Sequence, residues 1–175
     1  MTPSPEVGDD SPMPDDPNSV LPAPALRDWA SSLPSFAAEV VSQTDTSRPH
    51  IYTRMPAMAE HVGLIRAQLT GWAGRLGLTA VQRQDVVLAV DEAASNAVEH
   101  AYPSTPGTVT IFAAHTRSGD AVRVIVSDEG LWRPPPADPG FRGRGLAMME
   151  LVAEVFRLMS GPGGTTVVLG WSLPA

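Results

Sequence analysis

The stretch DVVLAVDEAASNAVEHAY, residues 85–102, decides the fold. It predicts a helix that is apolar over much of its circumference, because these residues recur at helical spacing: Val86, Val87, Val90, Ala93, Ala94 and Ala97. Glu92 and Asn96 are four residues apart and therefore share one face of that helix. Polar residues at the edge of such a surface need a partner or a function, and a solvated polar face is the alternative interpretation.

The boundaries of this helix can be located from the flanking residues. Thr79 is a suitable N-cap, with Gln82 three residues later as in a capping box. Pro103 follows the last helical turn, so we expect a helix from residue 79 to about residue 100.

Working outward from this helix, apolar periodicity and turn residues predict the other elements. We expect helices at 56–77 and 146–155, and strands at 50–55, 108–117, 121–127, 156–160 and 165–172. The resulting order β-α-α-β-β-α-β-β predicts an α+β fold, a two-layer α/β sandwich. Its helices would cover one face of a mixed, mostly antiparallel sheet.

The N-terminal part of the chain differs in composition from the rest. Residues 1–25 contain seven prolines and few large apolar side chains, which predicts disorder. Residues 26–41 carry apolar residues at three- or four-residue spacing, interrupted by Pro34, and predict a possible short helix. This helix would either pack on the domain or act as a partner-docking or autoregulatory segment. We therefore divide the chain into a disordered acidic, proline-rich tail (1–48) and one domain (49–175).

Charge and missing residue types exclude several functions. The net charge is −7, and most of it lies in residues 1–48, so the domain is nearly neutral and no direct nucleic-acid binding is expected. The absence of cysteine excludes disulfides and thiolate metal sites and fits a cytoplasmic protein. The absence of lysine excludes both a P-loop and the lysine of conventional protein kinases. No apolar run is long enough to span a membrane, and no secretory signal is recognisable.

A second cluster is VIVSDEG, residues 124–130. An apolar strand ends in Asp128, whose carboxylate could accept a hydrogen bond from the amine of adenine. Gly130 would let the base approach the backbone. The alternative is an ordinary turn.

Two further clusters are rich in glycine. In GFRGRGL, residues 140–146, Gly143 and Gly145 directly precede a predicted helix whose first amides could hold phosphate, and Arg142 and Arg144 add positive charge. A flexible linker is the alternative interpretation. The sequence GGTT, residues 163–166, opens the last predicted strand and by itself indicates only a turn.

Together and in this order, the four clusters resemble the ATP-binding domain of the GHKL superfamily, which includes histidine kinases, gyrases and MutL. They are most similar to its anti-sigma-factor serine kinase branch. Residues 92–102 resemble the first motif, 128–130 the second, 143–146 the third and 164–165 the last, so the resemblance covers about residues 50–172. It implies a sandwich of the Bergerat ATP-binding type.

The resemblance also implies a role for each matching residue. Glu92 would be the general base towards a serine hydroxyl, and Asn96 would be the ligand of Mg²⁺. Asp128 would read adenine, with Gly130 below the ring and Thr165 at the adenine end. The phosphates would lie among Arg142, Gly143, Arg144, Gly145 and Leu146.

The function implied by the resemblance is an ATP-binding anti-sigma factor that is also a serine/threonine protein kinase. Its cofactors would be ATP and Mg²⁺, and its partners a sigma factor, an anti-sigma-factor antagonist and a second copy in a homodimer. The alternative is a non-catalytic, ATP-dependent protein-binding module, favoured by the short, proline-rich segment 131–142. The catalytic half of a histidine kinase ranks last, because no histidine-bearing hairpin precedes Pro49.

Overall fold

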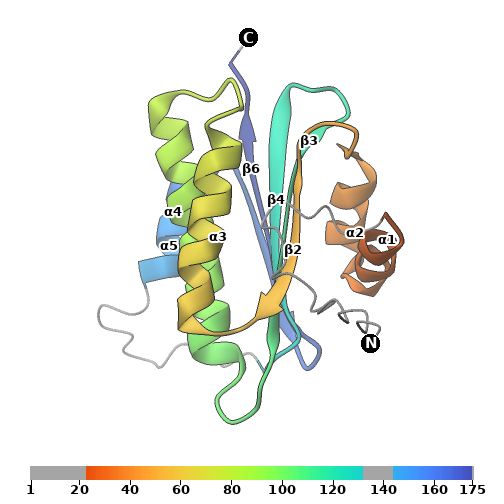
Figure 1. Ribbon diagram of the computed structural model, residues 1–175, viewed down its shortest axis with the longest axis vertical. Helices are drawn as coiled ribbons and strands as arrows, with labels where there is room; N and C mark the ends of the chain where they lie inside the picture. The colour runs from red at the N-terminus through yellow and green to blue at the C-terminus, as the bar shows by residue number, and fades with distance from the viewer. Residues whose placement is uncertain (1–22, 132–143, 175) are drawn as a thin grey trace, which may run out of the picture.

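The structure is a computed structural model that describes residues 23–131 and 144–174. The strands of its sheet are β1 (Thr44–Asp45), β2 (Ile51–Pro56), β3 (Thr108–Thr116), β4 (Ala121–Asp128), β5 (Val155–Gly161) and β6 (Gly164–Ser172). The helices are α1 (Ala23–Ser32), α2 (Ser35–Ser42), α3 (Ala59–Ala73), α4 (Ala80–Asn96) and α5 (Arg144–Val152). A π-helical turn, η1 (Ala97–Ala101), continues α4. The predicted α+β fold is confirmed (Figure 1).

The strands form one sheet in the order β1-β3-β4-β6-β5, with β2 also paired to β3. Every strand pair within the described residues is antiparallel, so the prediction of a mixed sheet was wrong in this detail. The chain does cross from β4 to β5 through α5, which gives these two strands the same direction. They do not pair because β6 returns by a hairpin and lies between them.

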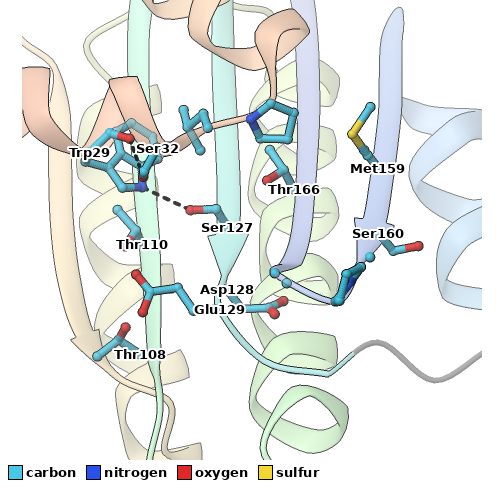
Figure 2. Close-up of a pocket in the computed structure, with 16 residues that line it drawn as sticks. Trp29, Ser32, Thr108, Thr110, Ser127, Asp128, Glu129, Met159, Ser160 and Thr166 are labelled. Atoms are coloured by element: carbon cyan, nitrogen blue, oxygen red, sulfur yellow. Dashed lines mark hydrogen bonds between the residues drawn. The ribbon is translucent and has the colours of Figure 1, made fainter.

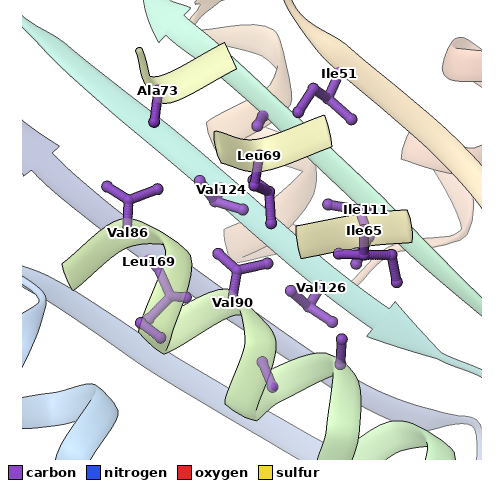
Figure 3. Packing of buried hydrophobic residues seen from close by; sticks show 14 of the residues in the cluster. Ile51, Ile65, Leu69, Ala73, Val86, Val90, Ile111, Val124, Val126 and Leu169 are labelled. Atoms are coloured by element: carbon purple, nitrogen blue, oxygen red, sulfur yellow. The ribbon is translucent and has the colours of Figure 1, made fainter. Parts of the chain in front are cut away.

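The main core lies between the sheet and the layer formed by α3, α4 and α5. Figure 3 shows Ile65 and Leu69 of α3 and Val86 and Val90 of α4 pointing at the sheet. Alternate residues of the central strands face this core, as the two-residue period of a strand requires: Val109, Ile111 and Ala113 of β3, Val122, Val124 and Val126 of β4, and Val167 and Leu169 of β6. This packing fixes α4 against the strand ends that carry the predicted site.

Helices α1 and α2 cover the opposite face of the sheet (Figure 1). The prediction that helices occupy one face only was therefore wrong, because the intervening strand positions are also apolar and need cover. Trp29 of α1 packs its ring 5.4 Å from that of Tyr52 and 5.9 Å from that of Phe112, between centroids. The single short helix expected at 26–41 is two helices, separated at Pro34.

These contacts place α1 and α2 in the same folded unit as the sheet, although the sequence analysis put the domain boundary near residue 49. The predicted disorder of residues 1–25 falls almost entirely outside the described residues. In the described part of the chain, no helix is both long and apolar enough to cross a membrane.

Helix α4 begins as predicted and ends differently. Thr79 and Gln82 form the expected capping box. The α-helical hydrogen bonding stops at Asn96, and the last residues of the predicted helix form the π-helical turn η1. Such turns are rare and occur often at functional sites. Pro56 was expected in the first turn of a helix but ends β2, and α3 begins at Ala59.

Candidate functional site

Asp128 is the best-defined residue of the candidate site. It ends β4 opposite Thr165 of β6, and its Oδ1 accepts hydrogen bonds from the backbone N–H groups of Gly130 (3.0 Å) and Thr165 (3.2 Å). Partial burial raises the pKa of this carboxyl above its ordinary value, against the lowering effect of the two hydrogen bonds. Its Oδ2 accepts no hydrogen bond from the described residues. The arrangement therefore presents one fixed acceptor to a ligand.

Gly130 packs against the end of the helix that carries Asn96. A β-carbon on residue 130 would overlap the carbonyl oxygen and the β-carbon of Ala101. The next amide, of Leu131, donates to the same carbonyl oxygen at 2.9 Å. Glycine is thus required here by the close approach of loop and helix.

Glu92 and Gly145 meet where α4 packs against α5. A β-carbon on Gly145 would overlap the side chain of Glu92, so the carboxylate lies over the first turn of α5. The N–H groups of a first helical turn have no intrahelical partner and can hold an anion. The structure thus brings the predicted base next to part of the predicted phosphate-binding segment.

Asn96 lies one helical turn beyond Glu92, at the last residue of α4. Both side chains are half-buried, and neither makes a hydrogen bond within residues 23–131 and 144–174. The amide oxygen of Asn96 is thus available as a ligand, on the same helix as Glu92.

The remaining predicted residues divide into three groups. Thr165 contributes through its backbone amide. Leu146 packs against the main core, and Arg144 lies exposed at the start of α5. Arg142 and Gly143 fall outside the described residues.

Tyr102 ends the stretch that resembles the first motif, but no role was predicted for it. Its hydroxyl donates to the carbonyl oxygen of Thr108 and accepts from the backbone N–H of Glu129, both at 2.7 Å. Tyr102 stands within the decisive stretch of sequence, but helical periodicity gave no signal for it because it follows the last helical residue.

A metal ion at this site would need ligands from the nucleotide as well as from the protein. Within the described residues, no group of three or more His, Cys, Asp or Glu side chains could hold a metal ion. Asn96 supplies a hard amide oxygen, and Mg²⁺ is commonly bound by few protein ligands together with substrate phosphates. The residues present therefore fit a metal that arrives with ATP.

A cavity of about 530 Å³ lies on the α1 side of the sheet (Figure 2). Its floor includes Thr110, Ser127 and Thr166, which are cross-strand neighbours on β3, β4 and β6. Trp29 lines it and donates its indole N–H to Ser127 Oγ at 3.1 Å (Figure 2). Asp128 and Glu129, at the end of β4, also line it. No sequence pattern indicated this cavity, because it depends on the register of three strands.

A sequence model of the family described as "Histidine kinase-like ATPase domain" matches residues 55–171. Among curated proteins, Serine-protein kinase RsbW of Bacillus subtilis is 44% identical over 85 residues, covering 46% of this chain and 50% of that protein. The protein of the same name from Staphylococcus aureus (strain JH9) is 39% identical over 80 residues, with the same two coverages. The chain thus spans about half the length of the curated relatives it matches.

Among solved structures, the chain is similar to a crystal structure of the RsbU and RsbW domains of a Mycobacterium tuberculosis protein. The TM-score is 0.57 and the sequence identity 33%. The match covers 73% of this chain and 34% of the other.

Proposed function

Because the chain belongs to the histidine kinase-like ATPase domain family, we propose that it is an ATP-binding anti-sigma factor and a serine/threonine protein kinase. The observation that carries the proposal is the hydrogen-bonded group of Asp128, Gly130 and Thr165. Relatives named serine-protein kinases support the choice of serine as the acceptor.

Asp128 would read the base. Its Oδ1 is occupied by two backbone amides, and its Oδ2 would accept from the exocyclic amine of adenine. Guanine presents a carbonyl oxygen at that position, and two acceptors facing each other in a half-buried site are unfavourable. The site would therefore prefer ATP to GTP, with Gly130 and Thr165 completing the adenine end.

Glu92 and the first turn of α5 would act at the phosphate end. The amides of that turn, with Gly143, Gly145 and the guanidinium groups of Arg142 and Arg144, would hold the phosphates. Glu92 would accept the proton of the attacking serine hydroxyl as that oxygen bonds to the γ-phosphorus and ADP leaves. Mg²⁺, held by Asn96 and the phosphates, would neutralise phosphate charge.

The partners belong to the same proposal. We infer that the phosphorylated substrate is an anti-sigma-factor antagonist and that the regulated partner is a sigma factor, through which transcription is controlled. A homodimer, a cytoplasmic location and no direct contact with nucleic acid complete the proposal. The near-neutral charge of residues 49–175 supports its last part.

A non-catalytic, ATP-dependent binding module is the second candidate. It is favoured by the segment of only twelve residues, 131–142, between Gly130 and Gly143, which contains four prolines. A segment with so few residues would enclose a nucleotide less fully, and phosphoryl transfer benefits from exclusion of water.

The test is to incubate the full chain with radiolabelled ATP, Mg²⁺ and candidate substrate proteins encoded by neighbouring genes. Transfer of label to a serine or threonine of one such protein is the expected result. Binding of Mg-ATP without any transfer would favour the binding module, and absence of ATP binding would overturn the proposal as a whole.

A further inference from the structure

The hydroxyl of Tyr102 connects two segments that border the proposed adenine end. It donates to the carbonyl oxygen of Thr108, the first residue of β3, and accepts from the amide of Glu129, directly after β4. Burial raises the pKa of this phenol, so the hydroxyl keeps its proton at neutral pH and both hydrogen bonds persist.

The ring of Tyr102 is also fixed in place. A β-carbon on Gly107 would overlap the ring, so the backbone at residue 107 lies directly against it. Tyr102 itself follows the π-helical turn that begins after Asn96. A ring held in this way leaves its hydroxyl in one position relative to the end of α4.

The segment from Asp128 to Leu131 depends on this end of the helix. The amide of Leu131 donates to the carbonyl oxygen of Ala101, and the amide of Glu129 donates to the hydroxyl of Tyr102. The third amide, of Gly130, donates to Asp128 within the segment. The amides of Glu129 and Leu131 thus donate to two consecutive residues, Tyr102 and Ala101.

We infer that Tyr102 is a positioning residue for nucleotide binding, which holds Asp128 and Gly130 in place through the amide of Glu129. This inference rests on the proposed function. It also links the two ends of the proposed site, because the helix whose end holds the adenine segment carries Asn96 and Glu92.

The chain offers a matched control, since its only other tyrosine is Tyr52. The Tyr52 hydroxyl also donates to a backbone carbonyl oxygen, that of Ala25 at 3.0 Å, but on the α1 side of the sheet. Tyr102→Phe and Tyr52→Phe each remove one phenolic hydroxyl and keep the ring. Only the first removes an acceptor from the segment that follows Asp128.

The experiment compares the parent, Tyr102→Phe and Tyr52→Phe by ATP titration, thermal unfolding and amide hydrogen exchange. Tyr102→Phe should weaken ATP binding about 3- to 10-fold, the scale of one or two net hydrogen bonds. Transfer at saturating ATP should stay within about two-fold, because the groups around the γ-phosphate are unchanged. Exchange over residues 129–131 should accelerate, whereas Tyr52→Phe should leave affinity and this exchange at parent values.

The outcomes separate this inference from the proposed function. If the parent binds ATP and Tyr102→Phe binds it equally well, the positioning role is overturned and the proposed function stands. Equal losses of affinity in the two variants would also overturn it, since they would indicate a general loss of stability. If the parent binds no ATP, the proposed function fails. Faster exchange of residues 129–131 in Tyr102→Phe alone would then still support Tyr102 as the residue that orders this segment.

Discussion

The carboxylate of Glu92 lies directly over the backbone of Gly145, in the space that a β-carbon on residue 145 would need. The two residues come from different helices, α4 and α5, that pack side by side. Glycine at position 145 therefore allows the acid and the first turn of α5 to approach each other.

Gly145→Ala should displace the Glu92 side chain and lower phosphoryl transfer by about 10-fold or more, part of the usual contribution of a positioned base. The melting temperature should change little, because the overlapping atoms are the end of a flexible side chain. Single-turnover transfer and thermal unfolding together measure the two effects. Gly63→Ala in α3 is the control, since a β-carbon there would meet no side chain or other element within 4 Å. Transfer at the parent rate in Gly145→Ala would contradict the assignment of Glu92.

Glu92→Gln and Asn96→Ala should separate catalysis from binding. Glu92→Gln keeps the size of the side chain and removes its basicity, so transfer should fall by roughly 10²–10⁴ while Mg-ATP affinity stays within a few-fold. Asn96→Ala should reduce both affinity and transfer, because the proposed Mg²⁺ ligand is lost. Nucleotide titration in the presence and absence of Mg²⁺ measures the difference. If Glu92→Gln transfers phosphate as fast as the parent, another residue is the base.

Asp128→Asn should weaken ATP binding by about 1–3 kcal/mol, the scale of a disrupted buried hydrogen bond. Asparagine keeps an Oδ1 that can accept from Gly130 and Thr165, but it places an N–H donor where Oδ2 would meet the adenine amine. Titration with ATP and GTP tests this. Equal affinity of the parent for the two nucleotides would remove the adenine-reading role.

The same variant should change how stability depends on pH. The folded-state pKa of Asp128 is raised above 3.8, so the folded protein binds more protons than the unfolded chain between the two pKa values. This carboxyl therefore disfavours folding progressively as the pH rises from about 4 through its folded-state pKa. Urea unfolding from pH 4 to 7 should show Asp128→Asn gaining stability relative to the parent. If the parent instead gained stability relative to Asp128→Asn as the pH rises, the two amides would favour the ionised carboxylate more than burial opposes it.

Shortening the N-terminus should have an effect that depends on where the cut falls. Removal of residues 1–22 should leave the melting temperature nearly unchanged, because this segment has few large apolar side chains. Removal of residues 1–48 should lower it strongly, since Tyr52, Phe112 and Ile125 would lose their cover. Circular dichroism during heating measures both.

Trp29→Ala tests the same cover with a single substitution. Removal of a buried tryptophan side chain costs about 3–5 kcal/mol, which corresponds to a fall in melting temperature of roughly 6–20 °C in a domain of this size. A smaller fall, within about 2 °C, would mean that α1 contributes little to stability.

Much of the fold follows from residues that are close in sequence. The apolar spacing of residues 85–97 and the Thr79 and Gln82 capping box were sufficient to predict α4, and apolar periodicity with turn residues predicted strands close to β3 and β4. The same holds for the position of Asp128 at the end of a strand. These features depend on helical and strand periods and on turn chemistry, which act over a few residues.

The relationships between distant residues were decided by the tertiary structure. The sequence marked Glu92 and Gly145 separately, but only the packing of α4 on α5 makes them neighbours. Tyr102 reaches Glu129 because the end of η1 lies beside the end of β4, and no local pattern encodes that approach. Trp29 covers Phe112 because both faces of the sheet are apolar, whereas the spacing of residues 26–41 indicated a short helix without the surface that it covers. Sequence alone thus determined the elements and the chemical types at the site, because their signals are local. The contacts that bring those residues together depend on register, helix packing and burial of apolar surface, which exist only once the whole chain has folded.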